Sequence, residues 1–350
     1  MKRIAVLTSG GDAPGMNAAI RAVVRTAGAN DMSVVGFKRG YNGVLMRNLN
    51  PDDDYELMTH RKVSGIVHRG GTVLMTARCK EFVEEEYQKL AIRNMRSLGV
   101  EGLVVIGGDG SFRGASSLNK LGFPVVGVPA TIDNDLAYTD FTIGFDTAVN
   151  TACECVNHIR ESSESHERAS LITVMGRDCG DIAIHTAVAC GAEFALVPEE
   201  PWSIEELSAK IKWGVVNGKR STIIIFAEGA FDSCTSDIHA LCSNNEKLRA
   251  IMDDKLTSSK LAAIIEGLTG HETRASVLGY VQRGGIPSSS DRILAARLGN
   301  RAVELLKNDQ SGIVVGIRDN KIIDFPICEV DKTKRPLNKE LKDLVDTLMK

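Results

Sequence analysis

The sequence predicts an α/β fold of the doubly wound kind, arranged as two lobes. Short apolar runs rich in β-branched residues recur along the chain, and segments with helical spacing separate several of them. Runs that are apolar at every position fit strands covered on both faces, as in parallel sheets. Because 350 residues are many for one hydrophobic core, we expect two lobes with mainly parallel sheets and an active site in the cleft between them.

The individual elements follow from these runs in chain order. The expected strands are RIAVLTS (3–9), GLVVIGG (102–108), FPVVGVPA (123–130), SLITVMG (170–176), FALVPE (194–199), STIIIFAEG (221–229) and GIVVGI (312–317). The expected helices are 17–29, 146–163, 204–216 and 288–306. Strands that alternate with helices favour parallel pairing. Ligands of such sheets bind beyond the carboxyl ends of the strands, so the turns there are the places to search for chemistry.

The bulk composition excludes several classes of protein. A formal charge of −3 offers no basic field for nucleic acid or anionic lipid, and 43% hydrophobic with 25% charged residues is an ordinary globular balance. The eight cysteines form no C-x-x-C pair, which favours a reducing, cytoplasmic location. The apolar run 4–7 is too short for a signal peptide, and no run approaches the length of a membrane span.

Two strand ends carry the same tripeptide, Gly-Gly-Asp, at 10–12 and 107–109. In the first turn, glycines allow N–H groups to approach an anion, and the following helix start adds partial positive charge. This pattern predicts a phosphate cradle with Gly11 at its centre, although a tight turn without a ligand is the alternative. In the second turn Asp109 lies between Gly108 and Gly110. Its carboxylate suits a nucleotide-bound Mg²⁺, with capping of a helix near Ser111 as the alternative.

The segment PATIDND places Thr131, Asp133 and Asp135 directly after the strand 125–128. A hydroxyl that attacks a phosphate needs an acceptor for its proton, and a carboxylate supplies one. Asp133 is the candidate base. Hydrogen bonding within the loop is the alternative for each acid, and it fits Asn134 and Asp135 better than Asp133.

Arginines at turn positions are the remaining polar signal. Guanidinium groups suit phosphate oxygens, although a single arginine is more often a solvated surface residue. The set comprises Arg78, Arg168, Arg177, Arg274 and Arg283. Glycines beside Arg177 and Arg283 favour ligand contact there. At the end of another strand, Glu228 suits either a substrate hydroxyl or a cap, and Arg21 and Arg25 share one helix face.

Seven ordered motifs now carry a resemblance that spans nearly the whole chain. They are LTSGGDAPGMNAAIR, RGGT, VVIGGDGS, TIDND, VMGR-x-CGD, ETRAS-VLG and QRGG. In this order the motifs resemble the bacterial type of ATP-dependent 6-phosphofructokinase.

The resemblance implies transfer of the ATP γ-phosphoryl group to the 1-hydroxyl of fructose 6-phosphate, the committing step of glycolysis, with Mg²⁺. It implies Asp133 as base and Asp109 acting through Mg²⁺, with Arg78 and Arg177 stabilising charge in the transition state. The implied catalytic set is Gly11, Arg78, Thr131, Asp133 and Arg177. The implied ATP contacts are Gly11, Arg78, Cys79, Gly108, Asp109, Gly110 and Ser111. The implied sugar-phosphate contacts are Thr131, Ile132, Asp133, Arg168, Met175, Gly176, Arg177, Glu228, Arg274, Tyr280 and Arg283.

The resemblance also implies an assembly and a division of labour. It implies a homotetramer, with Arg168 and Arg274 reaching the sugar phosphate of a neighbouring subunit and Arg283 acting within its own. The ATP-binding lobe is expected over 1–143 with 281–331, and the sugar-phosphate-binding lobe over 144–280 with 332–350. A nucleotide or phosphorylated metabolite is the expected kind of effector. Its expected contacts are Arg21, Arg25, Arg160, Glu193, Lys219 and Arg220.

Some positions depart from the family pattern or separate it from its relatives. Tyr280 stands where the family usually has histidine, and Asn217, Ser221 and Gly65 differ at the effector site. A sister group that uses pyrophosphate tends to have aspartate at the position of Gly110 and lysine at that of Ala130, so this chain favours ATP.

The alternatives are a pyrophosphate-dependent enzyme and a catalytically silent sugar-phosphate sensor. A lipid or NAD kinase lacks the TIDND acids in this arrangement, and a dehydrogenase needs G-x-G-x-x-G.

Overall fold

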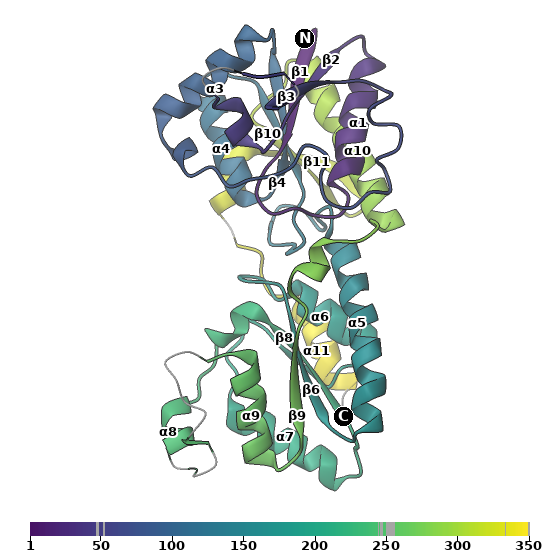
Figure 1. Ribbon diagram of the computed structural model, residues 1–350, viewed down its shortest axis with the longest axis vertical. Helices are drawn as coiled ribbons and strands as arrows, with labels where there is room; N and C mark the ends of the chain where they lie inside the picture. Colours follow the sequence, from purple (N-terminus) through teal and green to yellow (C-terminus); the bar gives the residue numbers. More distant parts are fainter. Residues whose placement is uncertain are drawn as a thin grey trace. The chain divides into compact units, whose positions relative to one another are not determined.

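The computed structural model describes residues 1–46, 49–51, 53–243, 245, 248–249, 256–332 and 334–348. The chain forms two compact units (Figure 1). Unit 1 comprises Met1–Ala148 and Arg283–Arg335, and unit 2 comprises Val149–Gln282 and Pro336–Lys350. Each unit holds a sheet with helices on both faces, so the α/β class is confirmed.

Unit 1 is built on a seven-stranded sheet in the order β11-β10-β5-β4-β1-β2-β3. Its central strands pair in parallel and its two edge strands, β3 and β11, run antiparallel to their neighbours. The strands are β1 (Arg3–Thr8), β2 (Ser33–Phe37), β3 (Tyr55–Met58), β4 (Gly102–Gly107), β5 (Val125–Pro129), β10 (Ile313–Arg318) and β11 (Lys321–Pro326). Residues of β4 and β5 are buried along their whole length, which explains their continuously apolar sequences.

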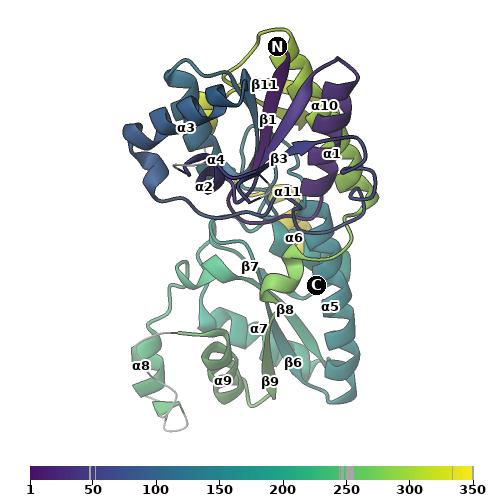
Figure 2. The same cartoon turned by 45° about the horizontal axis from the view of Figure 1, so that its top comes forward.

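Helices cover both faces of this sheet, with α1 and α10 side by side on one and α3 with α4 on the other (Figures 1 and 2). Gly299 in α10 allows the close packing, because a Cβ there would lie 2.8 Å from the Cβ of Ala22 in α1. The helices are α1 (Met16–Gly28), α2 (Tyr41–Val44), α3 (Glu85–Ser97), α4 (Asp109–Lys120) and α10 (Ser289–Lys307), with the 3-10 helices η1 (Glu81–Val83) and η5 (Ile327–Lys332).

Unit 2 has a four-stranded parallel sheet in the order β7-β8-β6-β9. Its strands are β6 (Ala169–Val174), β7 (Phe194–Leu196), β8 (Thr222–Ala227) and β9 (Thr273–Val277). Helices α5, α6 and α11 lie on one face and α7 and α9 on the other (Figure 1). The helices are α5 (Phe145–Ser165), α6 (Asp181–Cys190), α7 (Ile204–Val216), α8 (Ile238–Ser243), α9 (Ser258–Thr269) and α11 (Lys339–Leu348), with η2 (Glu228–Phe231) and η4 (Gly279–Arg283).

All seven expected strands and all four expected helices are present, with ends that differ by a few residues. Serine caps define two of the helix starts: Ser203 accepts a hydrogen bond from the N–H of Glu206, and Ser288 accepts one from that of Asp291. Within the described ranges, no helix combines the length and the apolar character that crossing a membrane requires.

Candidate functional site

The first group of site residues lies where the carboxyl ends of β1, β4 and β5 meet. These strands are neighbours in the sheet and run parallel. The chain leaves β1 into α1 on one face and leaves β4 into α4 on the other (Figure 1). Such a reversal is a topological switch point, the place where doubly wound sheets bind ligands. Both Gly-Gly-Asp turns and the TIDND loop therefore belong to one edge of the sheet.

The two glycine turns are in direct contact. A Cβ at Gly107 would lie 2.5 Å from both the carbonyl oxygen of Ser9 and the Oγ of Ser111, so only glycine fits. The N–H of Ser9 donates to the carbonyl of Ile106 (3.0 Å), and Gly10 has a φ of +87°. Glycine adopts that backbone conformation at little cost. The two turns therefore pack closely against each other at this end of the sheet.

Arg283 lies against the first turn. Its Nη1 donates to the carbonyl of Asp12 (3.1 Å), and a Cβ at Gly11 would lie 2.5 Å from the same nitrogen. The absence of a side chain at Gly11 therefore makes room for a guanidinium group. The sequence predicted both residues as ligand contacts but gave no sign that they touch.

Asp109 opens α4 and does not cap it. The N-cap residue is Gly108, and its helix has no side-chain cap hydrogen bond, so the capping alternative is wrong. The Asp109 carboxylate instead accepts a hydrogen bond from Nη1 of Arg113 at 2.9 Å, and Arg113 also reaches Asp331 at 3.4 Å. The Asp109 side chain remains 51% exposed, so it stays accessible to a ligand. Arg113 was missed, although its spacing of four residues from Asp109 was a signal.

The TIDND loop is held by its own polar groups. Thr142 Oγ1 donates to the carbonyl of Thr131 (2.6 Å), and the N–H of Thr142 donates to Oδ1 of Asn134 (3.0 Å). Asn134 has a φ of +53°, which asparagine tolerates better than most residues. The predicted loop role of Asn134 is thus confirmed.

The loop residues that are predicted to contact substrate, Thr131, Ile132 and Asp133, differ in burial and in neighbours. The N–H of Asp133 donates to Oγ1 of Thr131 (3.3 Å), and Asp133 is half-buried. A Cβ at Gly108 would lie 3.6 Å from the Cβ of Thr131, which places this threonine beside the second glycine turn. Ile132 has a side chain with 0% exposure and anchors the loop in the core. Only its main chain is available to a ligand.

The segment that carries Arg78 and Cys79 is tied to the first glycine turn. Thr76 Oγ1 donates to the carbonyl of Gly10 (2.8 Å), and Asn42 Nδ2 donates to that of Arg78 (3.3 Å). The Arg78 residue is exposed. Burial raises the pKa of the Cys79 thiol, which keeps it protonated at neutral pH.

A second group of site residues lies at the carboxyl ends of β6 and β8 in unit 2. The N–H of Gly229 donates to the carbonyl of Gly176 (3.3 Å), which has a φ of +121°. The N–H of Met175 donates to Oε1 of Gln282 (3.2 Å). Arg177 and Glu228 are both exposed at this edge. Gly229 and Gln282, which hold the loops together, were not predicted.

Replacing Gly229 by alanine is expected to displace the loop that carries Arg177. The new Cβ would lie 1.8 Å from the carbonyl oxygen of Arg177, so the main chain must move. We expect at least a tenfold rise in the KM for the sugar phosphate that the family resemblance implies, because a displacement near 1 Å costs about 10²-fold in well-positioned sites. Steady-state kinetics measure it. Arg93→Ala, at an exposed position of α3, is the control; equal KM values for both variants would contradict the prediction.

Arg168 and Arg274 lie at the opposite edge of the unit 2 sheet. Arg168 precedes β6 and Arg274 is the second residue of β9, whereas Met175 follows the carboxyl end of β6. A six-residue strand with a rise of about 3.3 Å per residue spans about 20 Å. Within one chain, the structure therefore does not bring the two arginines together with Arg177 and Glu228.

The other predicted residues fall into separate neighbourhoods. Tyr280 lies in η4 with 84% exposure. Glu193 pairs with Lys219 at 2.8 Å, and Nη2 of Arg160 donates to the carbonyls of Cys190 and Gly191.

The remaining basic effector candidates are spread over both units. Arg220 lies 3.6 Å from Glu167 in unit 2, whereas Arg21 and Arg25 lie on α1 in unit 1. Within unit 2 the structure thus gathers Arg160, Glu193 and Lys219 around the end of α6 and the start of β7.

Fold and site together define a doubly wound α/β protein whose two glycine turns meet at a switch point, the place where such sheets bind ligands. Residues 3–306 match the family described as Phosphofructokinase. The chain belongs to that family.

The curated relatives match this chain over nearly its full length. The chain is 50% identical over 348 residues to the ATP-dependent 6-phosphofructokinase of Clostridium tetani, covering 99% of each chain. It is 47% identical over 350 residues to that of Clostridium botulinum strain Hall, covering 100% of each. Among solved structures, phosphofructokinase from Saccharomyces cerevisiae superposes with a TM-score of 0.81 at 34% identity. All of this chain is covered there, but it spans only 47% of the yeast chain.

Proposed function

We propose that this chain is an ATP-dependent 6-phosphofructokinase, which catalyses the committing step of glycolysis. It transfers the γ-phosphoryl group of ATP to the 1-hydroxyl of fructose 6-phosphate, giving fructose 1,6-bisphosphate and ADP. The observation that carries the proposal is the meeting of two glycine turns and the TIDND loop at adjacent strand ends of one sheet. The Clostridium relatives, both named for this activity, support it.

The reaction needs a base, a cradle and positive charge. Asp133 accepts the proton of the 1-hydroxyl as its oxygen attacks the γ-phosphorus and the bond to the ADP oxygen breaks. Thr131 Oγ1 accepts a hydrogen bond from the N–H of Asp133 (3.3 Å), so the main chain that carries the carboxylate is held before substrate binds. The main chain around Gly11 receives nucleotide phosphate oxygens, and Arg78 and Arg177 stabilise the charge that develops in the transition state.

Asp109 suits a nucleotide-bound Mg²⁺. Magnesium in kinases takes one or two carboxylates together with substrate phosphates and water. The Asp109 carboxylate is 51% exposed and uses Oδ2 towards Arg113, which leaves Oδ1 for a cation. Among the described residues, no cluster of three or more His, Cys, Asp or Glu forms a metal site, which fits a metal that arrives with ATP. When bound, Mg²⁺ supplies neutralisation of phosphate charge.

The direct test is formation of fructose 1,6-bisphosphate from fructose 6-phosphate with Mg²⁺, comparing ATP with pyrophosphate. Turnover with ATP alone supports the proposal, including the interpretation of Gly110 and Ala130. Turnover with pyrophosphate would instead make the chain a pyrophosphate-dependent enzyme. No turnover with either donor, despite binding of fructose 6-phosphate in calorimetry, would indicate a sugar-phosphate sensor.

A homotetramer is part of the proposal. Arg168 and Arg274 lie at the amino ends of β6 and β9, whereas Met175 and Glu228 follow the carboxyl ends of β6 and β8 in the same sheet. The family resemblance implies that arginines at this amino end of the sheet bind the sugar phosphate in the site of a neighbouring subunit. Light scattering of the purified protein tests the assembly.

We also propose a cytoplasmic location, where a glycolytic kinase meets its substrates. A further proposal is an effector site at Arg160, Glu193 and Lys219, with contributions from Arg21, Arg25 and Arg220.

Removal of either Arg168 or Arg274 is expected to weaken sugar-phosphate binding selectively. A hydrogen bond to a charged group contributes about 1.5–3 kcal/mol, so Arg168→Ala or Arg274→Ala should raise the KM for fructose 6-phosphate by about 10–10²-fold. The KM for ATP should change by less than about threefold, since ATP binding relies on unit 1. Arg93→Ala, at an exposed position of α3, is the control. A larger effect on ATP than on the sugar phosphate would contradict the assignment.

A further inference from the structure

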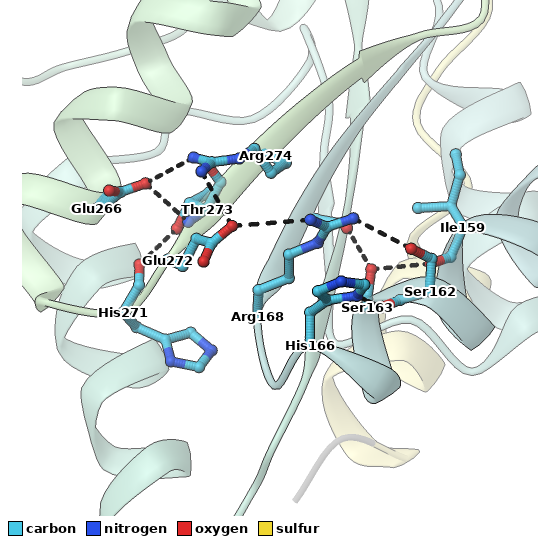
Figure 3. A network of polar contacts seen from close by, with 11 residues as sticks. Ile159, Ser162, Ser163, His166, Arg168, Glu266, His271, Glu272, Thr273 and Arg274 are labelled. Atoms are coloured by element: carbon cyan, nitrogen blue, oxygen red, sulfur yellow. Dashed lines mark hydrogen bonds and ion pairs between the residues drawn. The ribbon is translucent and has the colours of Figure 1, made fainter.

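The two arginines at the amino edge of the unit 2 sheet share one carboxylate. Figure 3 shows Arg168, which directly precedes β6, and Arg274 of the neighbouring β9, with Glu272 between them. Oε1 of Glu272 lies 3.7 Å from Nη1 of Arg168 and 3.0 Å from Nη2 of Arg274. The same oxygen therefore contacts both guanidinium groups.

Strand register places Glu272 there. Ala169 in β6 pairs with Thr273 in β9, and the N–H of Ala169 donates to the carbonyl of Glu272 (2.8 Å). The residues that precede these two strands, Arg168 and Glu272, are thus direct neighbours across the sheet. The main-chain pairing holds Glu272 in place whether or not its side chain is charged.

Each arginine also has an anchor of its own. Arg168 donates from Nη2 to Oγ of Ser162 (3.2 Å), and Arg274 donates from Nη1 to Oε2 of Glu266 (3.1 Å). Each guanidinium carries five N–H groups, and these contacts use only some of them. The remaining N–H groups are free to bind the oxygens of a phosphate group. Glu272 and Glu266 therefore fix the arginines without using up their donors.

Charge explains why a shared carboxylate matters. Two guanidinium groups side by side repel each other, and a carboxylate between them offsets that repulsion before a phosphate arrives. The side chains of Arg168, Glu272 and Arg274 are 22%, 44% and 55% exposed, so solvent screens the pairs and they add little to stability. Loss of Glu272 should consequently alter the placement of the arginines rather than the fold.

We propose that Glu272 is a positioning residue that holds Arg168 and Arg274 together as a two-arginine clamp for the phosphate of the sugar substrate. The inference rests on the proposed function, because it assigns the clamp to fructose 6-phosphate. Glu272 thereby holds both guanidinium groups in place before the phosphate dianion binds, so that both can donate hydrogen bonds to it together.

The test compares three substitutions at this position. Glu272→Gln keeps the shape but removes the charge, Glu272→Ala removes both, and Glu272→Asp restores the charge on a shorter side chain. We expect the KM for fructose 6-phosphate to rise about fivefold or more in the Gln variant and further in the Ala variant, with Asp nearest to the unsubstituted protein. The kcat and the KM for ATP should stay within about twofold, which a general loss of structure would not allow.

Two controls make the result specific. Glu85→Gln removes the same charge from an exposed pair with Lys89 in α3, and should leave every constant unchanged. In a background that lacks both arginines, Arg168→Ala with Arg274→Ala, adding Glu272→Gln should have no further effect. A second loss in that background would show that Glu272 does not act through the arginines and would overturn the proposal.

Further outcomes would also support or overturn the proposal. An unchanged KM in Glu272→Gln, or a lower one, would overturn the proposal, the latter because Glu272 would then merely oppose the phosphate. If the unsubstituted protein has no turnover with fructose 6-phosphate, the proposed function fails but the clamp does not. Calorimetry with inorganic phosphate then decides: weaker binding by Glu272→Gln supports the clamp, and equal binding refutes it.

Discussion

Asp133→Ser is expected to lower kcat by at least about 10²-fold, because it removes the acceptor for the hydroxyl proton. Serine keeps a small polar side chain on a loop whose fold relies on other groups, including the hydrogen bonds of Thr142 to Thr131 and Asn134. The KM values for both substrates should therefore change little. A loss confined to kcat is the signature of an interaction made only in the transition state.

The neighbouring acid provides a matched control. Asp135 lies two residues further along the same loop and is half-buried like Asp133. Asp135→Ser removes the same group and should lower kcat much less, by under about tenfold, since no proton transfer depends on it. Near-normal turnover in Asp133→Ser, or equal losses in the two variants, would remove Asp133 as the base. Circular dichroism should confirm that both variants are folded.

Most central strands could be predicted from the sequence because burial on both faces leaves no polar position, although β2 was missed. In β4 every residue from Gly102 to Gly107 is buried, and its apolar run shows this directly. The edge strand β11 has exposed and half-buried residues but none that is fully buried, and β3 has only four residues. Neither carries a continuous apolar signal, so both were missed, as was β9 in unit 2. The antiparallel pairing of β3 and β11 likewise depends on tertiary contacts.

The sequence indicated which turns to search, because glycine at a strand end has one strong physical use. Glycine turns at strand ends predict main-chain contact with phosphate, and the structure places Gly107 against Ser9, beside the first glycine turn. Partners that are distant in sequence could not be predicted. Arg283 lies against Gly11, and Glu272 lies beside Arg168 only because β6 and β9 pair in one register. Such contacts follow from strand order, which no local pattern reveals.

Gly110→Asp is expected to impair the use of ATP strongly. A Cβ at Gly110 would meet only Nη2 of Arg113, at 3.3 Å, and Gly110 lies within the first turn of α4. A side chain therefore fits the fold once the end of the flexible Arg113 side chain gives by a few tenths of an ångström, so we expect the main loss of activity to come from the ligand side. An added carboxylate beside nucleotide phosphates is repelled by about 1 kcal/mol in water and about 4 kcal/mol at an effective dielectric constant of 20. The KM for ATP should rise at least tenfold.

Gly110→Asn separates charge from size, since asparagine has nearly the same shape without the negative charge. If repulsion dominates, the Asn variant should keep most of its affinity for ATP while the Asp variant loses it. Equal losses would assign the effect to bulk, and unchanged ATP kinetics in both variants would refute the role of Gly110 in donor choice. The KM for fructose 6-phosphate should not change in either variant.

Pyrophosphate as donor completes the comparison, because it lacks the α-phosphate that an acid at 110 would repel. The Asp variant should therefore lose far more activity with ATP as donor than it loses with pyrophosphate.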